Sequence, residues 1–222
     1  AADEGTHISL WSTTGEKNSI KLVKYDMRLV DPVVLGDKVI FCSGGLPWSY
    51  RNPWVTDGTQ QGTLELQNLV RYSAGLDDHW NPVAWRGKVF FWGRSDSYGL
   101  ELFRTDGTPA GTGLVKDILP GSGDGGPGPH AYYRILPPAG DRLYFTAQDQ
   151  GGTLELWRTD GTTQGTRMVH DIYPGKGNSY PRDHQRLGWN RVIFLAQDPV
   201  NGQELWVSDG TGRGTGLLCQ PR

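Results

Sequence analysis

The sequence predicts an all-β fold, a β-propeller of four-stranded antiparallel blades. Three observations predict it: a motif recurs along the chain, short apolar runs alternate with turn residues, and no helical period is present. Tandem units of roughly 40 to 50 residues, each with four short strands, are typical of propeller blades, whose apolar faces are covered only by their neighbours. We therefore expect residues 1–222 to form a single propeller domain.

The recurring motif is centred on an Asp-Gly-Thr turn. It begins at Asp57, Asp106, Asp160 and Asp209, and Thr14 replaces the aspartate in a degenerate first copy. The steps between these five positions are 43, 49, 54 and 49 residues. The chain therefore divides into a half repeat and four full ones: residues 1–26, 27–70, 71–118, 119–172 and 173–222.

Each full repeat contains four short runs, which we expect to be strands A to D. Strand A ends at a polar turn, strand B carries a Phe, strand C carries Leu-Trp or a variant of it, and strand D follows a Gly-Thr pair. Five C and D pairs but only four A and B pairs give eighteen expected strands. The prediction is five blades with an incomplete N-terminal one, and a four-bladed ring with an extra hairpin is the alternative.

The residues before three of the turns extend the motif to Glu-Leu-Trp or Glu-Leu-Phe, beginning at Glu101, Glu155 and Glu204. In this form the sequence resembles the bacterial ELWxxDGT repeat family over nearly the whole chain. One repeat departs from the pattern with Asn52 and Pro53 in place of Glu-Leu. The resemblance implies a propeller-like protein that is secreted or lies at the cell surface, in an extracellular or periplasmic location. It carries no catalytic residues to transfer.

Composition excludes two classes of partner. With 22 Lys and Arg against 24 Asp and Glu, the chain lacks the basic field that nucleic-acid binding requires. The longest apolar runs span about four residues, whereas a membrane helix needs about twenty. We expect no nucleic-acid partner and no membrane span.

The repeated residues themselves have structural explanations. An Asp side chain accepts backbone N–H bonds within a turn, and Gly supplies the positive φ that such turns need. The Trp of strand C is expected to pack between blades. Cys42 and Cys219 leave two alternatives open, a disulfide that closes the ring or two free thiols.

In an up-and-down meander the variable loops share one face, which is where binding residues tend to lie. Three rings in these loops, Trp48, Trp80 and Tyr98, are expected to be exposed. Three aspartates accompany them, at Asp96, Asp149 and Asp198. Because aromatic faces stack on sugars while carboxylates bind hydroxyl groups, this set predicts lectin-like binding of a glycan or another small polar ligand.

Three histidines also recur on the loop face, His79, His130 and His184, each at or near the start of a strand A. If strand A lines the axis, three imidazoles would point toward one channel mouth. Such a cluster could bind zinc or copper. The long spacing between them matches no local ligand motif, so solvated loop histidines are the alternative.

The sequence thus leaves three functions open. The first is a secreted ligand-binding propeller, and the second is a protein-interaction scaffold that completes its half blade with another chain. The third is a metal-binding or metal-dependent protein. The sequence contains no motif for a nucleophile elbow, a phosphate loop or a zinc protease, and it therefore favours a protein without enzymatic activity.

Overall fold

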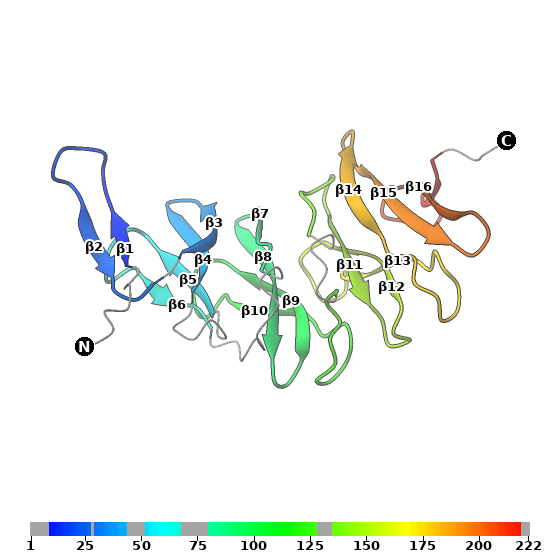
Figure 1. Cartoon of the computed structure of the whole chain (residues 1–222), viewed down its shortest axis with the longest axis horizontal. Helices are drawn as coiled ribbons and strands as arrows, with labels where there is room; N and C mark the ends of the chain where they lie inside the picture. Colours follow the sequence, from blue (N-terminus) through cyan, green and yellow to red (C-terminus); the bar gives the residue numbers. More distant parts are fainter. Residues whose placement is uncertain (1–8, 28, 44–51, 68–79, 128–134, 219–222) are drawn as a thin grey trace, which may run out of the picture.

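The computed structural model describes residues 9–27, 29–43, 52–67, 80–127 and 135–218, and these residues form seventeen strands. They contain no helix, and therefore none that could cross a membrane. Five antiparallel sheets follow one another in chain order along the longest axis of the molecule (Figure 1). The prediction of an all-β fold with four-stranded antiparallel sheets is confirmed. The first and fifth sheets lie at opposite ends of the row, so the expected closed ring of five blades is not confirmed (Figure 1).

Each sheet takes its strands from one predicted repeat. The first sheet has two strands, β1 (Leu10–Ser12) and β2 (Lys21–Lys24). The second sheet contains β3 (Val30–Leu35), β4 (Lys38–Ser43), β5 (Asn52–Thr56) and β6 (Leu64–Glu65). The third contains β7 (Val83–Trp85), β8 (Lys88–Ser95), β9 (Gly99–Thr105) and β10 (Gly113–Lys116).

The fourth sheet has three strands, β11 (Leu143–Gln148), β12 (Leu154–Thr159) and β13 (Arg167–His170). The fifth contains β14 (Arg182–Leu187), β15 (Arg191–Asp198), β16 (Gly202–Ser208) and β17 (Gly216–Leu217). Neighbouring strands in each sheet are consecutive in the chain, as the meander of a propeller blade requires.

The strand expected at the start of the fourth sheet is replaced by a looser contact. Leu136 donates its N–H to the carbonyl of Tyr144 at 2.9 Å, and Ala139 forms an isolated bridge with Arg142. Pro137 and Pro138 lie between these contacts, and neither has an N–H to continue a ladder. The expected count of eighteen strands is therefore one too high for the described residues.

Apolar cores lie between successive sheets. Phe90 and Trp92 of β8 meet Phe145 of β11 and Trp157 of β12 in one such core. The rings of Trp92 and Phe145 make an edge-on contact with centroids 5.5 Å apart. Trp157 is 7% exposed, so here the expected packing of the strand C aromatic between sheets is confirmed. Cys42 is buried in the core between the second and third sheets, while Cys219 lies outside the described residues.

Candidate interaction surfaces at the two ends of the row

The Asp-Gly-Thr turns are built by their own hydrogen bonds. In the third sheet, Asp106 accepts bonds from the N–H of Thr108 at 2.9 Å and from its hydroxyl at 2.6 Å. The Thr108 hydroxyl oxygen in turn accepts the N–H of Gly111 at 3.0 Å. The bonds from Thr108 lower the pKa of Asp106. The same bonds recur at Asp57, Asp160 and Asp209, so the interpretation of these aspartates as turn formers is confirmed.

Each turn also packs on the preceding sheet through its glycine. A Cβ on Gly161 would lie 3.1 Å from Cζ of Phe90, and one on Gly107 would lie 3.6 Å from Cδ1 of Ile40. Phe90 and Ile40 occupy the same position in their sheets, next to the Phe of strand B. Both glycines have a φ near +90°, a backbone conformation that favours glycine. The contact between turn and preceding sheet is thus a repeated interface.

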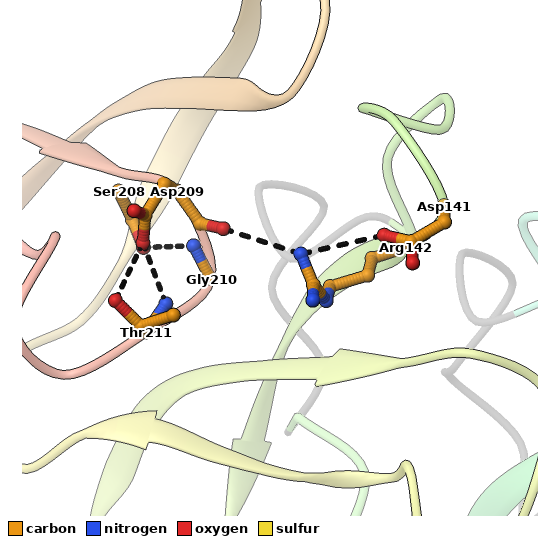
Figure 2. Close-up of polar contacts among 6 residues, drawn as sticks. All are labelled: Asp141, Arg142, Ser208, Asp209, Gly210 and Thr211. Atoms are coloured by element: carbon orange, nitrogen blue, oxygen red, sulfur yellow. Dashed lines mark hydrogen bonds and ion pairs between the residues drawn. The ribbon is translucent and has the colours of Figure 1, made fainter.

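At the last turn, the interface with the preceding sheet also contains polar contacts. Figure 2 shows Arg142, which directly precedes β11, between the carboxylate of Asp141 and the backbone of Asp209, which directly follows β16. The guanidinium donates to the Asp209 carbonyl at 3.4 Å and lies 3.3 Å from the Asp141 carboxylate. A Cβ on Gly210 would lie only 2.5 Å from the hydroxyl of Tyr144, the residue equivalent to Phe90.

Buried glutamates of strand C hold the segments that connect successive sheets. The carboxylate of Glu101, which is fully buried, accepts backbone N–H bonds from Ile118 at 3.0 Å, Leu119 at 2.9 Å and Gly125 at 3.1 Å. Burial raises the pKa of Glu101 to about 7, although the three N–H donors act in the opposite direction. The glutamate of the ELW motif therefore organises the connecting segment 117–127.

The fourth sheet repeats this arrangement. Glu155 accepts bonds from the N–H of Ile172 at 3.1 Å, the N–H of Tyr173 at 3.4 Å and the hydroxyl of Ser179 at 2.6 Å. Burial raises the pKa of Glu155 to about 7 as well. This role of the motif glutamates was not predicted from the sequence. The signal was present, because Asp-Ile-x-Pro-Gly begins at Asp117 and again at Asp171, each sixteen residues after a motif glutamate.

The connecting segments also join neighbouring sheets. Gly126 donates its N–H to Leu100 of β9 at 2.7 Å, and the carbonyl of Gly125 accepts the N–H of Gln148 of β11 at 2.8 Å. At the next junction, Ser179 donates to the Leu154 carbonyl at 3.1 Å and accepts from Gln197 at 2.8 Å. The third and fourth sheets, and the fourth and fifth, are therefore linked by backbone hydrogen bonds of the connecting segments as well as by apolar packing.

The predicted ligand-binding rings do not form one exposed set. Trp80 is only 7% exposed: its ring packs on Phe91 with centroids 4.5 Å apart, and its indole N–H donates to the Asp31 carbonyl. The expectation that Trp80 is exposed is wrong. Tyr98 is 42% exposed, as expected, and Trp48 lies outside the described residues.

Two of the three predicted aspartates are used inside their own loops. Asp149 accepts bonds from Gly151 at 2.9 Å and Thr153 at 3.0 Å, both through backbone N–H groups. Asp198 accepts the N–H groups of Val200 and Asn201. Asp96 lies in the turn between β8 and β9, beside Tyr98. Of the predicted ligand set, Asp96 and Tyr98 share one turn because they are two residues apart in the sequence.

The histidine cluster is not brought together in the described structure. His184 is 6% exposed, and its ring stacks on Phe194 with centroids 5.7 Å apart. Burial lowers its pKa to about 3, so the side chain is neutral at physiological pH. His79 and His130 lie outside the described residues. Within the described ranges, no three His, Cys, Asp or Glu side chains form a group that could hold a metal ion.

The C-terminal surface is the outer face of the fifth sheet. We define it by five aliphatic residues: Ile193, Leu195, Leu205, Val207 and Leu218. The first four form two directly opposed cross-strand pairs, Ile193 with Val207 and Leu195 with Leu205, and Leu218 donates its N–H to the Leu205 carbonyl at 2.8 Å. Their neighbours on the inner face, such as Phe194, are buried against the fourth sheet.

Equivalent positions in the preceding sheets are covered by the next sheet. Leu102 and Leu156 occupy the position of Leu205 and are both fully buried, whereas Leu205 is 36% exposed. Val115 occupies the position of Leu218 and is 3% exposed, against 40% for Leu218. The C-terminal surface is therefore an inter-sheet face that lacks its cover among the described residues.

The N-terminal surface lies at the other end of the row, on the first sheet. We define it by Trp11, Gly15 and Lys17. Trp11 occupies the position of Trp157, yet it is 56% exposed. Gly15 has the φ of an Asp-Gly-Thr glycine, +85°, but no other group approaches the place of its Cβ within 4 Å. This surface is the turn side of an inter-sheet interface, again without its cover among the described residues.

Together, the antiparallel four-stranded sheets and their inter-sheet cores define a β-propeller-type fold, and comparison with solved structures supports the fold alone. A puromycin hydrolase variant in complex with PGG superposes with a TM-score of 0.54 at 12% identity, over 91% of this chain and 30% of that one. TolB from Acinetobacter baumannii gives a TM-score of 0.47 at 12% identity, over 95% of this chain and 48% of that chain.

The β-propeller domain of the Trilobed protease from Pyrococcus furiosus, described as having an open velcro topology, is a weaker match. Its TM-score is 0.44 at 14% identity, over 90% of this chain and 58% of that one. The chain thus spans about a third to a little over half of the length of these structures. No protein-family model matches the chain, and the comparison with curated proteins finds no sequence match.

Proposed function

We propose that the chain is a protein-interaction module of β-propeller type that binds a partner through the C-terminal surface. The observation that carries the proposal is the exposure of this surface at positions where the preceding sheets are covered. Leu205 is 36% exposed where Leu102 and Leu156 are fully buried. Contiguous aliphatic side chains on one sheet face are typical of interaction sites rather than of free surface.

The kind of partner follows from the three apolar interfaces that join the second to the fifth sheet. Each covers an outer sheet face with another β-sheet, which contributes a ring from strand C and the glycine of a turn. The C-terminal surface therefore fits a second β-structured protein better than a small ligand. Placement outside the cell, which the ELWxxDGT resemblance implies, is part of the proposal.

Site-specific photo-crosslinking in the producing cells tests this function. A photoreactive amino acid at position 205 should give a covalent adduct with a polypeptide. The same group at Val200, which is 86% exposed at the β15–β16 turn, is the matched control and should give none. The substitution Ile193→Asp should abolish the adduct from position 205. Equal labelling from both positions, or no polypeptide adduct, would contradict the proposal.

In a closed five-bladed ring, the C-terminal surface would be covered within the same chain instead of by a partner. In it, the first sheet would cover the C-terminal surface of its own chain. The separation of the first and fifth sheets along the longest axis favours contact with another chain instead (Figure 1). A distance between fluorophores attached near residues 11 and 205 separates the two arrangements, because ring closure brings the labels together within one molecule.

Glycan binding on the loop face is a second proposal, favoured by the exposed ring of Tyr98 beside Asp96. Aromatic rings next to carboxylates suit sugar recognition. Glycan-array binding followed by titration calorimetry tests it: the Tyr98→Ala variant should lose saturable binding, while Tyr180→Ala, a change of another exposed ring, should keep it. Binding that is unaffected by Tyr98→Ala would contradict this proposal.

A further inference from the structure

We propose that the C-terminal surface binds the N-terminal surface of a second copy of this chain, so that copies associate head to tail. This inference rests on the interaction function proposed above and names its partner. Its basis is that the two surfaces are the two halves of an interface that the chain already forms between its own sheets.

The internal interface has a constant composition. The covering sheet contributes the strand C aromatic, three positions before the Asp of the turn, and the turn glycine one position after it. Trp206 lies in the core with Tyr144 and Leu156 of the preceding sheet, and Gly210 approaches Tyr144. Trp157 and Gly161 approach the third sheet in the same way.

The N-terminal surface presents the same two groups, and no other described residue covers them. Trp11 stands three positions before Thr14, and Gly15 follows it. The first turn keeps its shape although Thr14 replaces the aspartate, because Gly15 donates its N–H to the Thr13 hydroxyl at 3.0 Å and Glu16 donates to the Thr14 hydroxyl at 3.4 Å. The equivalent bond from Gly161 to Thr159 is 2.9 Å long. The first turn is therefore preformed for docking.

A polar contact extends the match. In two of the four turns, the third residue after the turn Asp bonds to strand D of the preceding sheet: the Gln60 side chain donates to the Leu22 carbonyl at 3.4 Å, and the Thr163 hydroxyl donates to the Val115 carbonyl at 2.8 Å. Lys17 occupies this position in the first turn, and its ammonium is also a donor. In the proposed contact, the Lys17 ammonium of one copy would lie against the last described residues of strand D in the fifth sheet of another copy, next to Leu218.

The C-terminal surface presents the complementary half. Ile193 occupies the position of Phe90 and Tyr144, which receive the turn glycines inside the row. Leu205 occupies the position of Leu102 and Leu156, which pack in the cores that contain Trp157 and Trp206 respectively. Because the two surfaces differ and lie at opposite ends of the row, their contact is heterologous, and it generates open chains or rings of copies.

Sedimentation velocity on the purified chain tests the inference. We expect the average mass to rise with concentration, with a dissociation constant of about 10 to 100 µM, because the contact surface is small. Trp11→Lys and Leu205→Lys should each abolish the rise. Both residues are at least 36% exposed, so the isolated chain should stay folded. Val34→Lys, which changes a 69% exposed residue of β3, is the control and should leave association intact.

Mixing the two variants tests the polarity of the contact. The Trp11→Lys copy keeps its C-terminal surface, and the Leu205→Lys copy keeps its N-terminal surface. An equimolar mixture should therefore form dimers and nothing larger, although neither variant associates alone. A chain that carries both substitutions has neither surface intact and should stay monomeric at every concentration.

Three results would overturn the inference: a monomeric unmodified chain at all concentrations up to about 1 mM, association that survives either substitution, or a mixture that fails to form dimers. A compact monomer whose ends are close together would assign the contact to ring closure instead. These results leave the photo-crosslink from position 205 unaffected. A monomeric chain that still crosslinks to another protein would retain the interaction function and remove only the second copy as partner.

Discussion

The carboxylate of Asp106 fills the space into which a side chain at Gly111 would project, since a Cβ there would lie 2.1 Å from its oxygens. The N–H of Gly111 closes the turn by donating to the Thr108 hydroxyl. Gly62, Gly165 and Gly214 stand in the same relation to their own aspartates. This close approach, rather than a positive φ, explains the second glycine of the repeat.

Gly111→Ala should therefore lower the free energy of unfolding by about 2 kcal/mol, because the aspartate must move and its bonds to Thr108 weaken. Gly113→Ala is the matched control, since no atom lies within 4 Å of the added Cβ. That change should be neutral or stabilise by about 0.5 kcal/mol, because alanine restricts the unfolded chain. Urea denaturation of both variants measures the difference, and equal effects would contradict the turn geometry.

The turn aspartates should make the fold sensitive to acid. Hydrogen bonds from Thr59 and Thr108 lower the pKa of Asp57 and Asp106 below the usual 3.8. A carboxylate with a depressed folded pKa contributes stability that is present above the unfolded pKa and is lost as pH falls through the folded one. We expect the free energy of unfolding to fall below about pH 4. Asp106→Asn should show a weaker fall, as measured by urea denaturation between pH 2.5 and 5.

Glu101 and Glu155 should act in the opposite direction at higher pH. Because burial raises their pKa to about 7, the folded state holds protons that the unfolded chain has already released. Stability is then greatest below the unfolded pKa of 4.5 and declines as pH rises to about 7, by at most about 3 kcal/mol for each glutamate.

The substitution Glu155→Gln tests this dependence. The variant should be less stable overall, since its amide nitrogen would face the N–H groups of Ile172 and Tyr173 or the Ser179 hydroxyl. Its stability should nevertheless decline less between pH 4.5 and 7 than that of the unmodified chain. Denaturation series at several pH values in this range measure both effects. Parallel curves for the two proteins would show that Glu155 stays ionised throughout.

His184 should remain neutral in the folded protein. Its pKa is lowered to about 3 by burial, so stability is complete above the unfolded pKa of 6.5 and is lost as pH falls toward 3. Between pH 6.5 and 5 this loss amounts to about 2 kcal/mol. His184→Leu should remove that part of the pH dependence in urea denaturation. A His184 imidazole that titrates near pH 6 in NMR spectra would contradict the burial.

The local features of the fold were the ones that the sequence could predict. Asp106, Gly107 and Thr108 form a turn through contacts within a few residues, so their spacing alone identified it. The missing strand in the fourth sheet was also local, and Pro137 with Pro138 could have predicted it. The exposure of Trp80 was predicted wrongly because this ring, near the start of the repeat 71–118, has no counterpart in the other repeats for comparison. Its burial depends on Phe91 and Asp31, which neighbour it only in space.

The interaction surfaces needed the three-dimensional structure. Trp11 and Trp157 share a position in the motif, and their sequence contexts do not reveal that one is 56% and the other 7% exposed. Exposure here depends on whether another sheet lies in front of the ring. The roles of Glu101 and Glu155 were missed for a different reason: their donors lie in the connecting segments, where the repeated Asp-Ile-x-Pro-Gly at Asp117 and Asp171 was the available signal.

The connecting segments determine which stretch of this chain could be duplicated without damage. A duplicated unit that begins and ends at the boundaries of a sheet would separate Glu101 from the backbone N–H groups of residues 118–125 that donate hydrogen bonds to its buried carboxylate. It would also remove the hydrogen bond from the N–H of Gln148 to the carbonyl of Gly125. A unit that runs from residue 101 to residue 154 contains the glutamate, its donors and β11. Insertion of a second copy of that stretch after Leu154 creates one new junction, from residue 154 to the second residue 101, and retains every one of these contacts in both copies. Growth or shortening of such arrays should therefore occur at the motif glutamate, in the middle of a sheet, and not in the loops between sheets.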